Sequence, residues 1–421
     1  MAIAFSLAAA GDLHLGSSFA YLTQAQADIL GQAQLEVFYN LCKYCARHRL
    51  DYLFLTGDLF DKLDPTPALL KSFQQGLALC PKTFVVVVPG NHDPYFAGGL
   101  WDQIKGTDHL HIIRQIGECW QSPRHKLRVY ASPFLSQSAD QCLFEEFTPA
   151  LDPTFFNLLL LHGDLLKPGQ NSRYNPIPQA WLASSGLDLA ILGHHHQASE
   201  VLHSGGRGQG SYLYPGCLMG RGFDELGPKG FYAGQVAKQS IQAGLGPQLQ
   251  LDLKFIQAPG PCFYRADMKL DQLSYASDQD LNLQMGQALQ AKLRNLSEHP
   301  DRDLFNLRLK GTRPGRIDLP FLRQFLLEQV FYLDLEDKTW APADWSRYSH
   351  EPSLRAQLSD LAQALLTSPH MSEASFQALF LDQEDDLSQQ LRDIRRLPED
   401  QQQVFLRLAT DKLYAGLAEE D

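Results

Sequence analysis

VVVPGNHD, residues 86–93, is an apolar run that ends in a glycine, an amide, an imidazole and a carboxylate. Four other segments have a similar form: LAAAGDLH (7–14), LFLTGD (53–58), LLLLHGD (158–164) and AILGHHH (190–196). Short apolar runs that are bounded by turn residues are typical of buried strands. The five segments therefore predict five buried strands, each followed by polar side chains.

Short apolar runs alternate with amphipathic stretches from residue 1 to about residue 262, which predicts an α/β fold. The expected strands are Ile3–Ala9, Tyr52–Thr56, Thr83–Val88, Phe156–Leu161 and Leu187–Leu192. Apolar residues at helical spacing predict one long helix from Thr23 to Leu50. Ligand sites of open α/β sheets lie beyond the carboxyl ends of the strands, so the polar side chains should converge there.

A second domain is predicted after the APGP segment at residues 258–261. Residues 263–338 have the pattern strand, helix, strand, helix, strand, which predicts a small α+β domain. Residues 339–421 are expected to form a linker and an acidic helical tail, with 15 Asp and Glu against 7 Lys and Arg from residue 341 onward. The helical expectation rests on leucines at helical spacing, such as Leu354, Leu358, Leu361 and Leu365.

The composition is that of an ordinary soluble protein, with 421 residues and 44% hydrophobic residues. A net charge of -12 argues against a uniformly basic surface for binding nucleic acid. Seven scattered cysteines do not resemble a secreted disulfide scaffold. No apolar run approaches the roughly 20 residues of a membrane span. We therefore expect a cytoplasmic protein without a membrane segment.

The polar residues after the strands form a set of metal-binding side chains. They supply two carboxylates, one amide oxygen and four imidazoles: Asp12, His14, Asp58, Asn91, His162, His194 and His196. This mixed oxygen and nitrogen set suits Mn²⁺, Fe²⁺ or Zn²⁺, whereas Ca²⁺ prefers more oxygens. Seven ligands exceed one coordination shell but serve two ions about 4 Å apart when one carboxylate bridges them. We expect Asp58 to be this bridge.

The order of these motifs resembles the calcineurin-like metallophosphoesterases. The resemblance rests on D-x-H at Asp12 and His14, GD at Asp58, GNHD from Gly90, an isolated His162, and GHxH at His194 and His196. It implies an αββα sandwich that binds two divalent ions, with Mn²⁺ expected and Fe²⁺ or Zn²⁺ as alternatives. One ion would be held by Asp12, His14, Asp58 and His196, and the other by Asp58, Asn91, His162 and His194.

The same resemblance implies roles for two residues that are not ligands. His92 would face the substrate phosphate and stabilise or protonate the leaving oxygen. Asp93 would orient the ring of His92, although it could instead act as a turn former. The nucleophile would be a metal-bound hydroxide. Asp61 is expected to support a ligand from outside the metal shell or to be structural, and His195 is expected to point away from the metals.

Further segments resemble the DNA repair exonuclease branch of this family, the SbcD-like and YhaO-like nuclease subunits. They are GDLHLG from Gly11, GDLFD from Gly57 and YPGCLMGRGFDELGPKGF from Tyr214. The branch implies a 3′-to-5′ exonuclease on duplex DNA that also cuts single strands. It also implies a domain that caps the DNA groove, a tail that binds an SMC-like coiled-coil ATPase, and a homodimer as one option.

Several alternatives stay open. The same ligands would serve a phosphomonoesterase or cyclic-nucleotide phosphodiesterase, or the chain could be a largely non-catalytic scaffold for the ATPase. A basic group in the second domain could contact DNA phosphates or could form a solvated strand face: Arg308, Lys310, Arg313 and Arg316. Cys42 and Cys45 are expected to be buried helix residues without a metal or redox role.

Overall fold

The computed structural model describes residues 2–340, apart from 106, 145–150, 204–209, 240–247, 271–275 and 314. The chain divides into two compact units. The first contains residues 1–264 together with 302–304, and the second contains 265–301 and the chain from 305 onward. The tail predicted from the sequence lies outside the described residues from position 341.

The first sheet of the first unit has the strand order β14-β13-β1-β2-β3-β4. The four parallel strands are β1 (Ala2–Ala10), β2 (Tyr52–Leu55), β3 (Phe84–Val87) and β4 (Leu110–Ile112). Two long antiparallel strands, β13 (Gly230–Gln239) and β14 (Gln248–Gln257), extend the sheet beyond β1. Because β1, β2 and β3 are parallel, their carboxyl ends lie at one edge of the sheet.

The second sheet has the order β11-β12-β10-β7-β6-β5. Its central strands are the parallel β6 (Leu127–Ser132), β7 (Phe156–His162), β10 (Leu189–Gly193) and β12 (Ser211–Leu213). The antiparallel strands β5 (Glu118–Gln121) and β11 (Leu202–His203) close the two edges. A separate pair, β8 (Leu165–Leu166) and β9 (Ile177–Pro178), follows β7 and precedes α4 (Gln179–Ser184).

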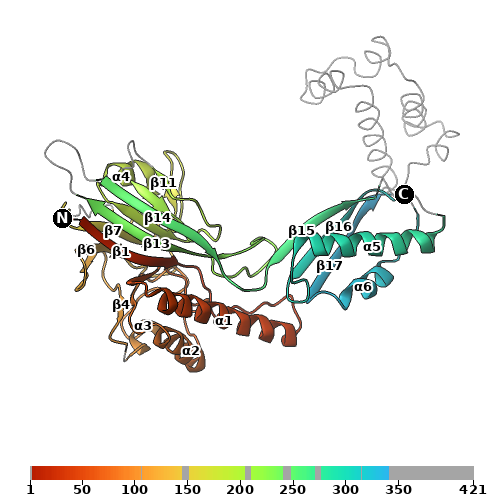
Figure 1. The fold of residues 1–421 in the computed structure, drawn as a ribbon, viewed down its shortest axis with the longest axis horizontal. Helices are drawn as coiled ribbons and strands as arrows, with labels where there is room; N and C mark the ends of the chain where they lie inside the picture. The colour runs from red at the N-terminus through yellow and green to blue at the C-terminus, as the bar shows by residue number, and fades with distance from the viewer. Residues whose placement is uncertain are drawn as a thin grey trace, which may run out of the picture. The chain divides into compact units, whose positions relative to one another are not determined.

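The main core lies between the two sheets. Alternate residues of the facing strands fill it, for example Phe54 of β2 and Leu158 of β7. The helices α1 (Gln24–His48), α2 (Pro67–Ala78) and α3 (Leu100–Gln103) lie beside the first sheet (Figure 1). The helix α4 packs through Leu182 on the outer face of the second sheet. These layers confirm the predicted αββα sandwich.

The sequence explains where the longest helix begins and ends. Thr23 and Gln26 form a capping box at the start of α1, which satisfies backbone N–H groups of the first turn. Arg49 has a left-handed backbone (φ 53°) and ends the helix. The long helix predicted from Thr23 to Leu50 is therefore confirmed, and Cys42 and Cys45 are buried within it.

The second unit has a three-stranded sheet in the order β15-β16-β17 and two helices, α5 (Asp278–Leu296) and α6 (Leu319–Leu327). The strands are β15 (Phe263–Lys269), β16 (Leu304–Thr312) and β17 (Tyr332–Trp340). The element order agrees with the sequence pattern of strand, helix, strand, helix, strand. No helix among the described residues is long and apolar enough to cross a membrane.

Three of the four residues of the predicted basic group in the second unit are paired with acids. Arg308 Nε and Lys310 Nζ each lie 2.6 Å from a carboxylate oxygen of Asp267. Arg313 Nη2 lies 3.2 Å from Asp337 Oδ2. These ion pairs neutralise much of the positive charge of the basic group. They therefore favour the interpretation of the group as a solvated strand face over its interpretation as a phosphate-binding patch.

A buried ion pair connects the two sheets of the first unit. Lys238 of β13 donates to Asp188 Oδ2 at 2.8 Å and to the carbonyl oxygen of Phe155 at 2.8 Å. Asp188 precedes β10 and also accepts from the backbone N–H of Asn157 in β7. Burial raises the pKa of Asp188, whereas the bond from Asn157 and the Lys238 ammonium oppose this rise. The ion pair therefore connects β13 of the first sheet with β7 and the start of β10 in the second sheet.

Replacing Lys238 with methionine should destabilise the first unit by about 3–5 kcal/mol, because it leaves the buried Asp188 carboxylate without its cation. Loss of the ammonium raises the pKa of Asp188 further. Ionisation of an acid whose pKa is raised by folding opposes folding, so the variant should lose stability as pH rises through the acid's unfolded and then its folded pKa. Urea unfolding at about pH 4 and about pH 7 measures both effects.

The matched control is Lys338→Met, which removes the same atoms from an exposed pair with Glu336 in the second unit. It should change stability by less than about 1 kcal/mol. A Lys238→Met protein as stable as this control, or equally destabilised at both pH values, would contradict a structural role for the buried pair.

Candidate metal centre

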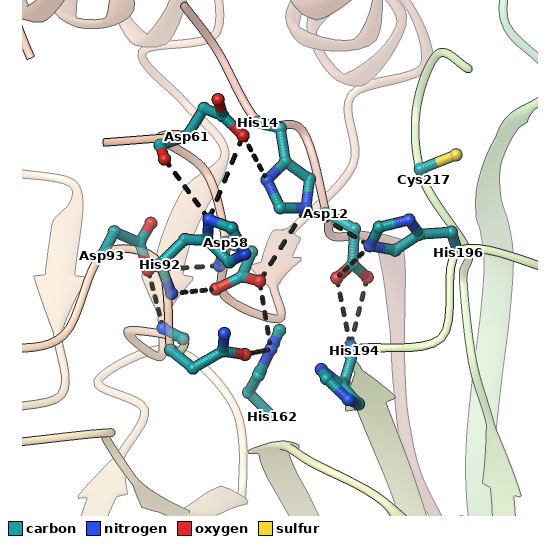
Figure 2. A network of polar contacts seen from close by, with 12 residues as sticks. Asp12, His14, Asp58, Asp61, His92, Asp93, His162, His194, His196 and Cys217 are labelled. Carbon is teal, nitrogen blue, oxygen red and sulfur yellow. Dashed lines mark hydrogen bonds and ion pairs between the residues drawn. The ribbon is translucent and has the colours of Figure 1, made fainter. Parts of the chain in front are cut away.

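The seven predicted ligands come together beyond the carboxyl ends of five strands. Figure 2 labels all of them except Asn91. The first sheet supplies four of them from the loops after β1, β2 and β3: Asp12, His14, Asp58 and Asn91. The second sheet supplies the last residue of β7 and two residues after β10: His162, His194 and His196. Two sheets thus contribute to one group of side chains.

The backbone at this edge is strained. Among the described residues, seven positions other than glycine have a positive φ, and four of them are predicted ligands: Asp12 (50°), His14 (44°), Asp58 (52°) and His194 (94°). Such conformations are costly for residues with a Cβ atom and are concentrated at functional sites. The preceding Gly193 must be a glycine, because a Cβ there would lie 2.0 Å from the carbonyl oxygen of Thr56.

The first cluster of metal-binding atoms consists of Asp12, His14 and His196. The Nε2 atoms of the two histidines are 3.3 Å apart. His196 Nε2 lies 3.7 Å from Asp12 Oδ1. Asp12 also accepts from the backbone N–H of His194 at 3.1 Å, which connects the loops after β1 and β10.

The second cluster consists of Asp58, His162 and His194, with Asn91 beside it. His162 Nε2 lies 3.4 Å from Asp58 Oδ2 and 2.9 Å from Asn91 Oδ1. The same Oδ2 atom of Asp58 is 3.8 Å from His14 Nε2 of the first cluster. Asp58 therefore lies between the two clusters, where a bridging carboxylate would have to lie.

Hydrogen-bond partners outside the centre orient two of the imidazoles. The Nδ1 atoms of His162 and His196 lie 2.8 Å from the carbonyl oxygen of Thr56 and 2.5 Å from Glu225 Oε1, and His14 Nδ1 lies at an ion-pair distance of 3.2 Å from Asp61 Oδ1. In a neutral imidazole, an Nδ1–H that donates outward leaves the Nε2 lone pair facing inward. The Nε2 atoms of His162 and His196 face the carboxylates of Asp58 and Asp12, an arrangement that fits bound cations.

The ionisable groups of the site shift one another's pKa values strongly. Burial alone would raise the pKa of Asp58, but His162 and the other nearby histidines outweigh burial and lower it. Burial alone would lower the pKa of His162, but the Asp58 carboxylate outweighs burial and raises this pKa to about 9. Burial and the charge of His162 lower the pKa of His194 to about 4. Without a metal, a protonated His162 therefore supplies positive charge beside the Asp58 carboxylate.

The structure corrects the role expected for Asp93. Its buried carboxylate accepts from backbone N–H groups of the loops after β2 and β3, with distances of 2.6 Å to Leu59 and 2.7 Å to Gly90. It also accepts from Asp58 and Phe60. The carboxylate is directed into these loops because four buried donors require an acceptor there. Asp93 therefore fixes the loop that carries Asp58.

The acid beside the His92 ring is Asp61. His92 Nδ1 lies 3.3 Å from the carbonyl oxygen of Asp61 and 4.0 Å from its Oδ1 atom. The backbone N–H of His92 donates to Asp58 Oδ1 at 2.8 Å. The His92 side chain is 42% exposed, the largest exposed fraction among the predicted site residues, so its ring is accessible to a substrate.

The sequence did not reveal the outer acceptors Glu225 and Asp164. Glu225 lies in the segment after Tyr214 that carried the family resemblance, but no spacing rule assigned it a role. Asp164 Oδ1 lies 2.9 Å from His195 Nε2, and its Oδ2 lies 3.7 Å from His194 Nε2. His195 is thus engaged outside the two clusters, as expected.

Affinity for Mn²⁺ should increase with pH from about pH 6 to about pH 9. His162 must lose a proton to bind a cation, and its pKa is raised to about 9. Each pH unit below that value should weaken binding of the second-cluster ion by up to about tenfold. Isothermal titration calorimetry in buffers of different ionisation enthalpy should detect the released proton. Mn²⁺ affinity that does not change over this range would show that His162 is not a ligand.

Two solved structures are similar to this chain, each with 11% sequence identity and a TM-score of 0.35. One is TT1561 of Thermus thermophilus, with 54% of this chain and 93% of that chain covered. The other is a dimetal phosphatase of Danio rerio, with 60% of this chain and 99% of that chain covered.

A curated relative, the uncharacterized metallophosphoesterase YhaO of Bacillus subtilis, is 26% identical over 242 residues. The match covers 55% of this chain and spans 57% of the length of the Bacillus protein. The family model for calcineurin-like phosphoesterases matches residues 5–221, which include all seven predicted ligands. The chain therefore belongs to the calcineurin-like phosphoesterase family.

Proposed function

We propose that this metallophosphoesterase is a two-metal-dependent DNA nuclease that acts as a 3′-to-5′ exonuclease and also cuts single strands. The observation that carries the proposal is the exposure of the centre: the side chains of His92, His194 and His196 are 42%, 22% and 26% exposed. An accessible centre suits a phosphodiester within a long chain, whose remaining nucleotides must lie outside the site.

The residues around the centre support phosphodiester hydrolysis. Two bound divalent ions would lower the pKa of water and neutralise charge on the phosphoryl group. Asp58 holds the His92 backbone, and Asp61 lies beside Nδ1 of the ring, which leaves Nε2 for the substrate. His92 can then donate a proton to the leaving oxygen. Mn²⁺ is our proposed metal, since the mixed oxygen and nitrogen donors accommodate it.

Support for DNA as the substrate comes from the resemblance to the repair exonuclease branch. The segment from Tyr214 to Phe231 favours this branch over other phosphoesterases. An SMC-like ATPase that binds the acidic tail, and a homodimer, are proposals on the same grounds.

A small-substrate phosphomonoesterase or cyclic-nucleotide phosphodiesterase is the second candidate. The net charge of -12 and the carboxylate partners of Arg308, Lys310 and Arg313 favour it, since few free cations would meet a polyanion. The two candidates share the same centre, so only the choice of substrate separates them.

The wild-type protein with Mn²⁺ should shorten a linear duplex from its 3′ ends, and His92→Ala should reduce the rate by roughly 100-fold or more, since a general acid contributes about 10²–10⁴. The assay is digestion of an end-labelled duplex, alone and with a candidate ATPase. The matched control is His48→Ala, which changes the last residue of α1, a ring stacked on Tyr44.

Turnover of a small aryl phosphodiester is then measured with and without unlabelled duplex. Inhibition at micromolar DNA concentration is expected for a nuclease. Digestion that does not exceed the His92→Ala background, combined with aryl phosphodiester turnover that DNA does not inhibit, would favour the small-substrate enzyme instead.

A further inference from the structure

We propose that Arg221 is a positioning residue for one of the two metal ions, because it joins the two carboxylates that orient His14 and His196. This inference rests on the dinuclear centre and does not depend on DNA being the substrate. Arg221 lies in the segment GRGFDE (220–225), in the loop between β12 and β13. Neither the family motifs nor the ligand spacing assigns it a role.

The contacts form a closed ring. Arg221 Nη1 lies 3.1 Å from Asp61 Oδ1, which is 3.2 Å from His14 Nδ1. Arg221 Nη2 lies 3.1 Å from Glu225 Oε1, which is 2.5 Å from His196 Nδ1. The two histidines meet through their Nε2 atoms at 3.3 Å. A shift of either carboxylate would therefore rotate an imidazole of the first cluster.

The loop that carries Arg221 is itself fixed by Glu225. The backbone N–H of Arg221 donates to Glu225 Oε2 at 2.8 Å, and Glu225 N–H donates to the carbonyl oxygen of Gly222 at 3.1 Å. Tyr21 donates its hydroxyl to the carbonyl oxygen of Arg221 at 3.0 Å. Arg221 is thus held through its backbone as well as its guanidinium, as a residue that aligns others must be.

The guanidinium of Arg221 is directed at carboxylates and not at solvent. Nη1 lies 3.1 Å from Asp61 Oδ1 and Nη2 lies 3.1 Å from Glu225 Oε1, and the side chain is only 23% exposed. Both ends of the guanidinium are therefore already engaged by carboxylates that contact the histidines.

The second cluster uses different supports. His162 donates from Nδ1 to the carbonyl oxygen of Thr56 at 2.8 Å, and Asn175 donates to the carbonyl oxygen of His162 at 2.8 Å. His194 Nε2 lies 3.7 Å from Asp164. Among the contacts of the described residues, none joins Arg221 to this cluster. Removing the guanidinium should therefore weaken one ion far more than the other.

The test is Mn²⁺ binding to the full-length protein without substrate. The metal-free wild type, Arg221→Met and Arg221→Lys are dialysed against graded Mn²⁺, and bound metal per chain is measured by mass spectrometry. In Arg221→Met the ion beside His14 and His196 should bind roughly 10–100-fold more weakly, while the other ion keeps its affinity. A loss of this size is typical when a residue that orients a metal ligand is removed. The affinity of Arg221→Lys for the ion beside His14 and His196 should lie between those of the wild type and Arg221→Met, since a lysine ammonium cannot hold both carboxylates as the arginine fork does.

Electron paramagnetic resonance gives an independent signature. At a Mn²⁺ concentration that fills both sites of the wild type, Arg221→Met should show the six-line signal of isolated Mn²⁺ in place of a spin-coupled pair. The matched control is Arg173→Met, which removes an exposed arginine paired with Asp140 and should behave as wild type.

Equal weakening of both ions, or unchanged binding of both, would overturn the proposal. If Arg221→Met does not fold, Glu225→Gln replaces it, because it retains the shape of the side chain but removes the anion between Arg221 and His196. The same selective loss is expected. A protein that binds two ions but does not cleave DNA would contradict the nuclease function and leave this inference intact.

Discussion

Asp58 is the residue on which the rest of the site depends. One of its oxygens lies 3.8 Å from His14 and 3.4 Å from His162, so it contacts both clusters of donor atoms. Its other oxygen accepts from the backbone N–H of His92. Burying this carboxylate requires positive charge nearby, whether from a protonated His162 or from bound cations. Without a cation, His162 of the second sheet supplies that charge, since its pKa is raised to about 9.

The surrounding fold keeps strained loops in place around this carboxylate. Asp12, His14, Asp58 and His194 all have a left-handed backbone, which isolated loops would not retain. Asp93 satisfies four backbone N–H groups of the loops after β2 and β3. The buried core between the sheets provides the rigid base from which these loops extend. Stability of the sandwich and geometry of the centre are therefore linked.

The sequence predicted the parts that depend on local pattern. Apolar runs followed by glycine and polar residues identified the strands that carry the seven ligands, and helical spacing identified α1. The long strands β13 and β14 were not predicted, although Leu249, Leu251 and Leu253 of β14 alternate with polar residues as strand residues do. The sequence offered a turn-forming role for Asp93 as an alternative and placed Asp61 outside the ligand set. The contacts of both, and the roles of Glu225 and Arg221, could not be predicted, since they depend on distant loops that meet only in the folded chain. The family resemblance suggested that Asp93 contacts the His92 ring, but the Asp93 carboxylate accepts instead from four buried backbone N–H groups.

The most direct test of the two-metal account is a crystal structure of the Mn²⁺-loaded protein with anomalous diffraction data collected at the manganese edge. Two anomalous peaks about 3.5–4 Å apart are expected, with the Asp58 carboxylate between them. One peak should lie beside His14 and His196, and the other beside Asn91 and His162. A single peak, or two peaks that do not share Asp58, would contradict the account.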